Sequence, residues 1–199
     1  ETVIRAGGAV PATIAVIDGQ VRVGLSTAEL ERLADTNNPW KVSRDNLATA
    51  IAQNATGGTT VAATMLCAYQ TRISIFATGG IGGVHRGWEE SLDISADLRE
   101  LARTPVTVVC SGAKSLLDLP ATLEYLETMG VPVIGLATHE LPAFFSVDSG
   151  LALRQTVSNV AEAAAIIEKR RALQLDGGEI LAVPPQHKLH FLRRKSNSG

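Results

Sequence analysis

The feature of this sequence that most limits its fold is a regular alternation of β-rich runs and helical segments from residue 72 onward. Each run is rich in β-branched and apolar residues, as buried strands are, and a segment of helical periodicity separates it from the next. Strands that alternate with helices connect through right-handed crossovers into a mainly parallel sheet. The sequence therefore predicts an α/β fold whose buried strands are RISIFAT (72–78), VTVVC (106–110), VPVIGLA (131–137) and EILAVP (179–184).

The N-terminal part lacks this alternation and predicts a small antiparallel hairpin. Two β-rich runs, 12–18 and 21–25, are joined through Asp18-Gly19, which is a hairpin turn signal. Ser26 and Glu29 then stand at the spacing of a capping box and predict a helix to about residue 35. Ser43 is expected to cap a second helix that ends near residue 53.

Length and composition indicate one folded domain. The chain has 199 residues, of which 45% are hydrophobic and 19% charged, and we expect one α/β domain over residues 1–184. Residues 185–199 are predicted to form a divergent, disordered tail. The formal net charge of -2 gives no field that attracts a polynucleotide, so no nucleic-acid partner is expected, whereas a small anion remains a candidate.

Nothing in the sequence predicts a membrane span or a secreted protein. No apolar stretch approaches the roughly 20 residues that cross a bilayer, and the first residues carry no signal-peptide pattern. Cys67 and Cys110 lack the spacing of a disulfide framework or a zinc site, which favours a reducing compartment. The expected location is cytoplasmic, with import into an organelle left open.

Lys114 is the first candidate for chemistry because it stands directly after a predicted strand, in CSGAKS (110–115). This spelling lacks the Gly-Lys-Ser/Thr ending of a P-loop, and no glycine stands five residues before Gly112. Two interpretations remain: a surface lysine in a loop, or a neutral amine that attacks a carbonyl carbon.

A second candidate is the glycine-rich segment FATGGIGGVHRG (76–87), which does not spell GxGxxG. Such a density of glycine indicates backbone that passes close to a ligand. His85, Asp93 and Asp97 follow, and the two aspartates would share one side of a helix if it begins there. They predict either a helix cap with a first-turn acid or oxygen ligands for Mg²⁺ or Mn²⁺.

A third candidate is the segment NATGGTT (54–60), where a helix start with Thr59 and Thr60 could bind a phosphate or form an ordinary turn. Lys41 precedes another expected helix start, where a cation is unfavourable unless an anion binds. If the strands before Lys114 and before the glycine-rich segment are neighbours, Lys114, Asp93 and Asp97 share one pocket.

Several long motifs occur in one order: PATIAVIDG, KVSRDNL, TTVAATM, FATGGIGGVHRG, DISADL, VCSGAKSLLD, LETMGVPVIG and LPAFF. In this the chain resembles the pseudouridine-5'-phosphate glycosidases, closely over residues 1 to about 150 and more loosely to 184. The resemblance implies reversible cleavage of pseudouridine 5'-phosphate to uracil and ribose 5-phosphate. It also implies one divalent cation, Mn²⁺, per subunit and a homotrimer.

The same resemblance assigns roles to residues that match the motifs. Lys114 is the expected nucleophile and Asp93 the expected metal ligand, whereas His85 belongs to the signature without an assigned role. The expected substrate-binding residues are Lys41, Val61, Ser95, Ala96 and Asp97.

The bond to be broken explains why a lysine is needed. An ordinary glycosidase protonates an exocyclic oxygen, but pseudouridine joins sugar to base through carbon. If the ribose ring opens and neutral Lys114 forms an imine at C1', the C–C bond can break as uracil C5 accepts a proton. Lys114 is therefore predicted to be a Schiff-base lysine.

The resemblance also predicts that this sequence is the central part of a longer family member. The family's general-acid glutamate would precede Glu1, and its last helices would follow about residue 184. We therefore expect residues 1–199 alone to bind ribose 5-phosphate weakly and release little uracil. The alternatives are a non-catalytic homologue that binds sugar phosphates or nucleotides and, third, a lysine-dependent aldolase acting on sugar phosphates.

Overall fold

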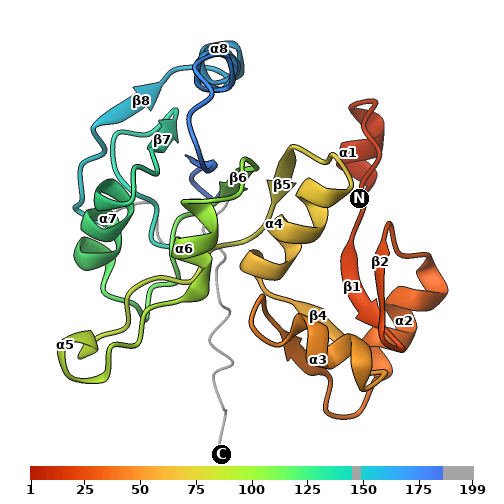
Figure 1. Ribbon diagram of the computed structural model, residues 1–199. Helices are drawn as coiled ribbons and strands as arrows, with labels where there is room; N and C mark the ends of the chain where they lie inside the picture. Colours follow the sequence, from red (N-terminus) through yellow and green to blue (C-terminus); the bar gives the residue numbers. More distant parts are fainter. Residues whose placement is uncertain (145–148, 186–199) are drawn as a thin grey trace, which may run out of the picture.

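Two β-sheets lie on either side of helix α4 (Val61–Gln70) in the computed structural model, as Figure 1 shows. The structure describes residues 1–144 and 149–185. The tail predicted at 185–199 therefore lies outside the described residues except for Pro185. Among the described helices, none combines the length and the apolar character needed to cross a bilayer.

The first sheet has four strands in the order β2-β1-β4-β3 and extends the predicted hairpin. Strands β1 and β2 pair antiparallel, with Ile17 opposite Gln20, and this confirms the hairpin. Helix α2 begins with the predicted capping box between Ser26 and Glu29. The elements of this part are α1 (Thr2–Ala6), β1 (Ile14–Ile17), β2 (Gln20–Val23), α2 (Thr27–Asp35), β3 (Trp40–Val42), α3 (Leu47–Ala52) and β4 (Gly57–Thr59).

Strand β4 is absent from the sequence-based prediction because glycine has low strand propensity. It pairs antiparallel with β1 and parallel with β3. A Cβ atom on Gly57 would lie 2.2 Å from the Trp40 carbonyl oxygen, so the close approach of these two strands requires glycine. Tertiary packing therefore sets this strand, against its local propensity.

The predicted cap at Ser43 is wrong, since helix α3 begins later, at Leu47. The Asn46 side chain explains why the helix begins at Leu47. Its Oδ1 accepts a hydrogen bond from the Ser43 N–H at 2.8 Å, and its Nδ2 donates to the Lys41 carbonyl at 3.1 Å. These bonds hold residues 43–46 in a turn, and the turn fixes the backbone next to Lys41.

The second sheet confirms the predicted α/β class, with five parallel strands in the order β5-β6-β9-β7-β8. Strand β9, the last strand among the described residues, inserts between β6 and β7. The strands are β5 (Ile75–Ala77), β6 (Thr107–Cys110), β7 (Val133–Leu136), β8 (Gln155–Val157) and β9 (Glu179–Ala182). The helices are α5 (Trp88–Ser91), α6 (Ala96–Leu101), α7 (Leu119–Thr128) and α8 (Val160–Ala172).

Both edges of this sheet differ from the prediction. Strand β5 was expected to be buried, but it is an edge strand and Ile75 is 60% exposed. Strand β8 forms the other edge and was not predicted, since Gln-Thr-Val carries a single apolar residue. Edge strands bury less side chain than central ones, so their sequence signal is weaker.

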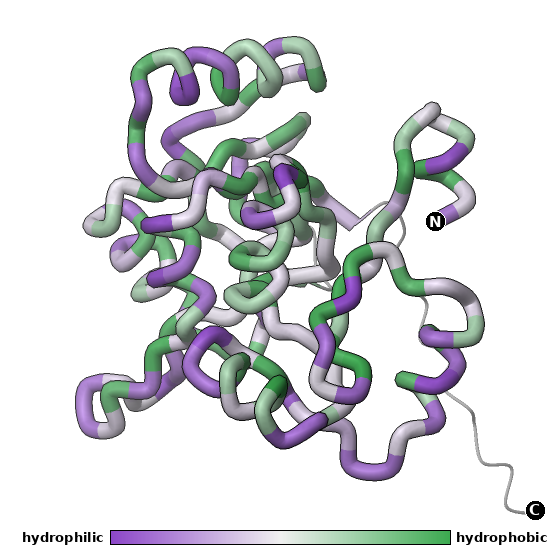
Figure 2. Tube along the Cα trace, turned by 45° about the vertical axis from the view of Figure 1, so that its right-hand side comes forward, coloured by the Kyte–Doolittle hydropathy of each residue, from purple (hydrophilic) through white to green (hydrophobic). Residues whose placement is uncertain are grey.

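The main core lies under the parallel sheet and joins it to α4 and α6. Met65 of α4, Leu98 and Leu101 of α6, and Val108 of β6 are fully buried in this cluster. Figure 2 shows hydrophobic residues concentrated toward the middle of the molecule and hydrophilic residues on the outer turns. This core holds α4 and α6 rigidly beside the loops that follow β5 and β6.

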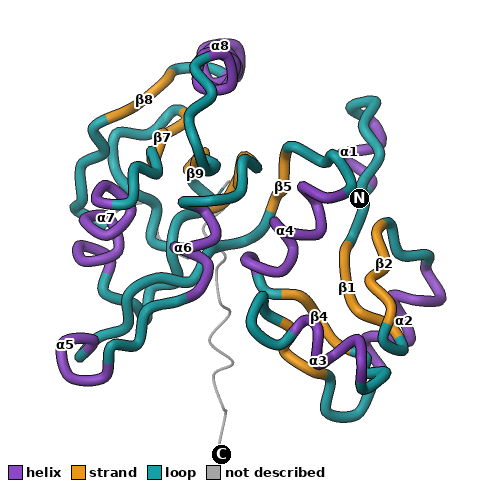
Figure 3. The backbone as a smooth tube through the Cα atoms, viewed as in Figure 1, coloured by secondary structure: helices purple, strands orange, loops and turns teal. Residues whose placement is uncertain are grey.

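Those loops leave the carboxyl ends of the parallel strands, which is where ligands bind in open α/β sheets. Figure 3 shows that the chain between β5 and α6 is almost entirely loop, interrupted by α5 alone. The glycine-rich segment and the Asp93 segment both belong to this stretch.

Candidate active site

One cavity of about 890 Å³ opens at the carboxyl ends of β5 and β6. The first sheet supplies one wall, through β3, β4 and the start of α4, and the glycine-rich segment, residues 93–97 and the Lys114 loop supply the other. It gathers Lys114, Asp93 and Asp97 into one pocket, as the sequence predicts, although their chemical roles stay predictions. All the candidate residues line it: Lys41, Val61, His85, Asp93, Ser95, Ala96, Asp97 and Lys114.

The Lys114 loop and the glycine-rich segment lie side by side because β5 and β6 are paired neighbours. The Lys114 N–H donates to the Ile81 carbonyl at 3.2 Å, and the Ile81 N–H donates to the Gly112 carbonyl at 3.1 Å. Gly112 has a φ of +80°, and a Cβ atom there would lie 1.9 Å from the Pro142 carbonyl oxygen. Glycine therefore sets the turn that directs Lys114 into the cavity.

Lys114 and Lys41 bring two positive charges to the cavity from its two walls. Both side chains are exposed, and within residues 1–144 and 149–185 neither forms an ion pair. The Asp97 carboxylate accepts hydrogen bonds from two backbone amides. Asp93 Oδ2 lies 3.6 Å from His85 Nδ1. A cavity with two unpaired ammonium groups favours an anionic ligand.

Asp97 is 7% exposed, and backbone amides already occupy both of its carboxylate oxygens. Oδ1 accepts from the Ala62 N–H and Oδ2 from the Gly82 N–H, each at 2.9 Å. Ala62 stands at the start of α4, and Gly82 stands in the glycine-rich segment. Asp97 therefore joins the two walls of the cavity, a role that the sequence does not reveal.

The condition under which Asp93 and Asp97 would share one side of a helix is not met, and Asp97 is instead an acid in the first turn of α6. Helix α6 begins at Ala96 with Ser95 as its cap, so Asp93 precedes the helix. The Asp93 side chain is 61% exposed, and its Oδ2 lies 3.6 Å from His85 Nδ1. The His85 N–H also donates to the Asp93 carbonyl at 3.0 Å, which fixes the two residues side by side.

The metal prediction depends on Asp93 alone. Among the described residues, no group of three His, Cys, Asp or Glu side chains is arranged to hold a metal ion. A structural zinc site needs four protein ligands, so this geometry does not fit one. Mg²⁺ and similar ions can bind through one or two carboxylates with water and substrate oxygens, and Asp93 fits that type of site.

The start of α4 offers less to a phosphate than the sequence suggests. Thr60 caps the helix by accepting from the Ala63 N–H, and its hydroxyl donates to Ser43 Oγ at 3.2 Å. The Thr59 hydroxyl donates to the Ile14 carbonyl at 2.9 Å. The Ala62 N–H is already bonded to Asp97 and is not free for a phosphate. Lys41 is therefore a stronger phosphate-binding candidate than the start of α4.

Cysteine chemistry is disfavoured. Burial raises the pKa of Cys110, at the end of β6, to about 11, so the thiol stays protonated near neutral pH. Burial also raises the pKa of Cys67. Lys114 is therefore the better candidate nucleophile beyond β6.

Sequence reasoning missed several apolar residues of the cavity. Trp40, Ile94, Leu116 and Phe144 also line it. A Cβ atom on Gly80 would lie 2.4 Å from a Phe144 ring carbon, so glycine makes room for that ring. No local signal distinguishes these residues from core or loop positions.

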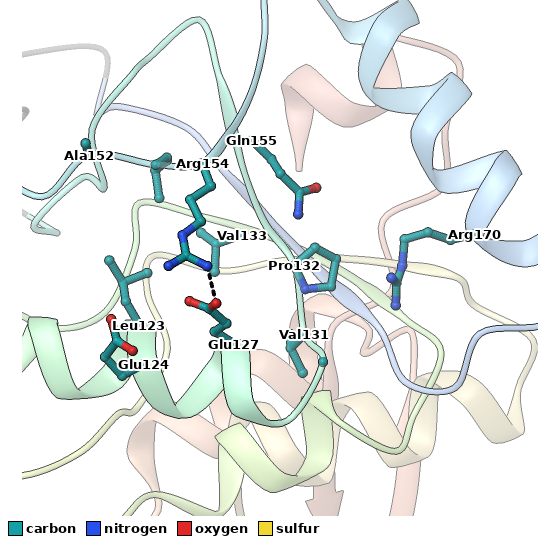
Figure 4. A pocket seen from close by; sticks show the side chains of 12 residues that line it. Leu123, Glu124, Glu127, Val131, Pro132, Val133, Ala152, Arg154, Gln155 and Arg170 are labelled. Carbon is teal, nitrogen blue, oxygen red and sulfur yellow. Dashed lines mark hydrogen bonds and ion pairs between the residues drawn. The ribbon is translucent and has the colours of Figure 1, made fainter.

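A second cavity of about 360 Å³ lies between α7 and the amino ends of β7 and β8. Figure 4 shows Arg154 pointing toward Glu127, with which it forms an ion pair, and Val131, Pro132 and Val133 nearby. None of the candidate residues lines this cavity. Of its two arginines, Arg154 pairs with Glu127 and Arg170 with Glu179, and among the described residues no lysine, cysteine, serine or threonine lines it.

Comparisons with known proteins show the family to which the chain belongs. The family model described as "Indigoidine synthase A like protein" matches residues 1–198. The chain belongs to this indigoidine synthase A-like family. Curated relatives named pseudouridine-5'-phosphate glycosidase include one from Glaesserella parasuis, 56% identical over 92% of this chain, and one from Staphylococcus aureus, 53% identical over 95%. These names confirm the resemblance predicted from the motifs.

Two solved structures share the fold. The prealnumycin C-glycosynthase AlnA, in complex with ribulose 5-phosphate, has a TM-score of 0.88 and 41% identity over 92% of this chain and 61% of its own. An indigoidine synthase A-like protein from Thermotoga maritima has a TM-score of 0.86 and 34% identity over 93% of this chain and 62% of its own. The chain spans 61% and 62% of the length of the two curated relatives.

Proposed function

We propose that this chain carries the sugar-phosphate and lysine centre of a pseudouridine-5'-phosphate glycosidase. The observation that carries the proposal is the single cavity that Lys114 and Lys41 enter from different walls, with Asp93 beside them. The names of the relatives support the substrate, and the ribulose 5-phosphate in the prealnumycin C-glycosynthase supports a phosphorylated five-carbon sugar as ligand.

The proposed reaction uses Lys114 as a nucleophile on the sugar. After its ammonium group gives up a proton to solvent, the Nζ lone pair bonds to C1' as the C1'–O4' bond opens and O4' takes up a proton. Protonation of uracil C5 then allows the C1'–C5 bond to break, and the nitrogen lone pair forms the C1'=N imine. Water hydrolyses the imine, which regenerates the amine and releases ribose 5-phosphate.

Lys41 is proposed to bind the 5'-phosphate. Its charge has no ion-pair partner among the described residues and reaches the cavity from the wall that does not carry Lys114. A sugar phosphate that touches both lysines is thereby oriented with C1' toward the nucleophile. Val61, Ser95 and Ala96 line the space between and are proposed to contact the substrate.

The proposal is tested by measuring ribose 5-phosphate binding and uracil release from pseudouridine 5'-phosphate in parallel. We expect ribose 5-phosphate to bind at least about tenfold more tightly than ribose, because an ion pair with the phosphate adds on the order of 1.4 kcal/mol. The Lys41→Met variant should lose that difference. Binding with little uracil release is the result expected of residues 1–199 alone, and equal affinity for the two sugars would contradict the phosphate site.

For the cation, Asp93 is the residue proposed to hold Mn²⁺. When bound, the ion would supply positive charge beside the sugar phosphate. We expect Asp93→Asn to lower Mn²⁺ affinity at least about tenfold, because an amide oxygen carries no formal charge. Titration followed by the Mn²⁺ paramagnetic resonance signal measures this, with exposed Glu89→Gln as the control. Undiminished affinity in Asp93→Asn would exclude Asp93 as the ligand.

A further inference from the structure

Helix α6 connects the two walls of the cavity through a second buried carboxylate besides Asp97. Glu100 stands three residues after Asp97, one turn along α6, and is 1% exposed. Arg44 Nη1 donates to both of its oxygens, at 2.7 and 2.9 Å. The Thr104 hydroxyl donates to Glu100 as well. Arg44, from the first-sheet wall, thus forms an ion pair with a buried carboxylate of the other wall, while its own side chain stays 39% exposed.

The position of Arg44 links this partly buried ion pair to Lys41. Arg44 lies in the turn that Asn46 closes by bonding to the Ser43 N–H and to the Lys41 carbonyl. Ser43 and Lys41 both line the cavity, whereas neither Arg44 nor Glu100 does. Any effect of the Arg44–Glu100 pair on a ligand must therefore act through the placement of the turn.

We propose that Arg44 and Glu100 are positioning residues that set the distance between the Lys41 wall and the Lys114 wall. A buried carboxylate that loses its cation is strongly unfavourable, so the pair resists movement of the turn away from α6. The phosphate and C1' of a sugar phosphate are joined by a short chain of bonds, which limits the distance between them. The two lysines must match that distance for both ends to be held at once.

The inference rests on the proposed function, and its test compares ribose 5-phosphate with ribose. Arg44→Met keeps much of the side-chain stem and removes the charge. It should weaken ribose 5-phosphate binding at least about tenfold and ribose binding less than about twofold, since ribose has no phosphate for Lys41. Arg44→Lys restores the charge but not the guanidinium geometry, and should recover part of the affinity. The control is Arg32→Met, which breaks an exposed ion pair with Asp18 in the same part of the chain and should change neither affinity.

A second readout does not depend on any ligand. The Ser43 N–H bonds to Asn46 Oδ1 at 2.8 Å, and the Thr60 N–H bonds to the Val42 carbonyl at 2.8 Å. In Arg44→Met, hydrogen exchange at the Ser43 and Thr60 amides should be at least about tenfold faster than in Arg32→Met, under conditions where both variants are folded. A wild-type chain that binds no ribose 5-phosphate would contradict the proposed function, and the exchange rates would still test the pair.

Two results would overturn the positioning role. One is an equal loss of affinity for ribose and ribose 5-phosphate in Arg44→Met, which indicates general loosening of the fold. The other is unchanged hydrogen exchange at Ser43 and Thr60, which shows that the pair does not hold the turn.

Discussion

Replacing Lys114 with methionine is expected to abolish covalent capture of ribose 5-phosphate while leaving its non-covalent affinity within about threefold. Methionine keeps the length of the side chain but has no amine to attack C1'. Loss of a nucleophile that forms a covalent intermediate lowers rates by at least about a thousandfold. Lys41, on the other wall, still offers its charge to the phosphate.

Oxygen exchange at C1' measures this effect, because forming and hydrolysing an imine replaces the aldehyde oxygen with oxygen from water. The wild-type chain should accelerate incorporation of labelled oxygen into ribose 5-phosphate, and Lys114→Met should return the rate to that of buffer. Lys169→Met, on α8 and outside the cavity, is the matched control and should exchange as the wild type does. Full exchange in Lys114→Met would assign the chemistry to another group.

Asp97→Asn is expected to lower the free energy of unfolding by about 2–3 kcal/mol and to disrupt the cavity. Asparagine presents one acceptor oxygen, so its NH₂ group faces either the Ala62 N–H or the Gly82 N–H. A buried donor left without an acceptor costs on the order of 1–3 kcal/mol, and the lost charge weakens the remaining bond. The change should also weaken ribose 5-phosphate binding, since α4 and the glycine-rich segment separate.

Denaturant unfolding measures the loss, and Asp93→Asn is the matched control. Asp93 lies in the same segment and is exposed, so the same change of charge should alter stability by less than about 0.5 kcal/mol. Equal stability of the two variants would contradict the account of Asp97 as the residue that joins the walls.

The α/β class could be predicted because the central strands β6, β7 and β9 are continuous apolar runs, as strands buried on both faces are. The hairpin followed from Asp18-Gly19. Strand β4 could not be predicted, since Gly57 and Gly58 are favoured there only by the approach of β3. The start of α3 was misplaced because a side chain, Asn46, competes with the helix for backbone groups.

The sequence predicts which residues line the candidate site. It does not predict how exposed each residue is or which residues contact one another. Lys114 and the glycine-rich segment follow neighbouring strands, and this adjacency is a consequence of strand order. Asp93 is exposed and Asp97 is buried because α6 begins at Ala96. The sequence DISAD alone does not determine where the helix begins. The partnership of Arg44 with Glu100 joins residues far apart in sequence, so no local pattern could reveal it.

The measurement that tests the central claim most directly is reduction of the chain with borohydride in the presence of ribose 5-phosphate. Borohydride converts an imine into a stable amine, so the sugar phosphate stays bound to the residue that formed it. Peptide mass spectrometry should then locate the added mass on Lys114, and no adduct should form in Lys114→Met. A chain that binds ribose 5-phosphate yet yields no adduct at Lys114 would contradict the Schiff-base mechanism.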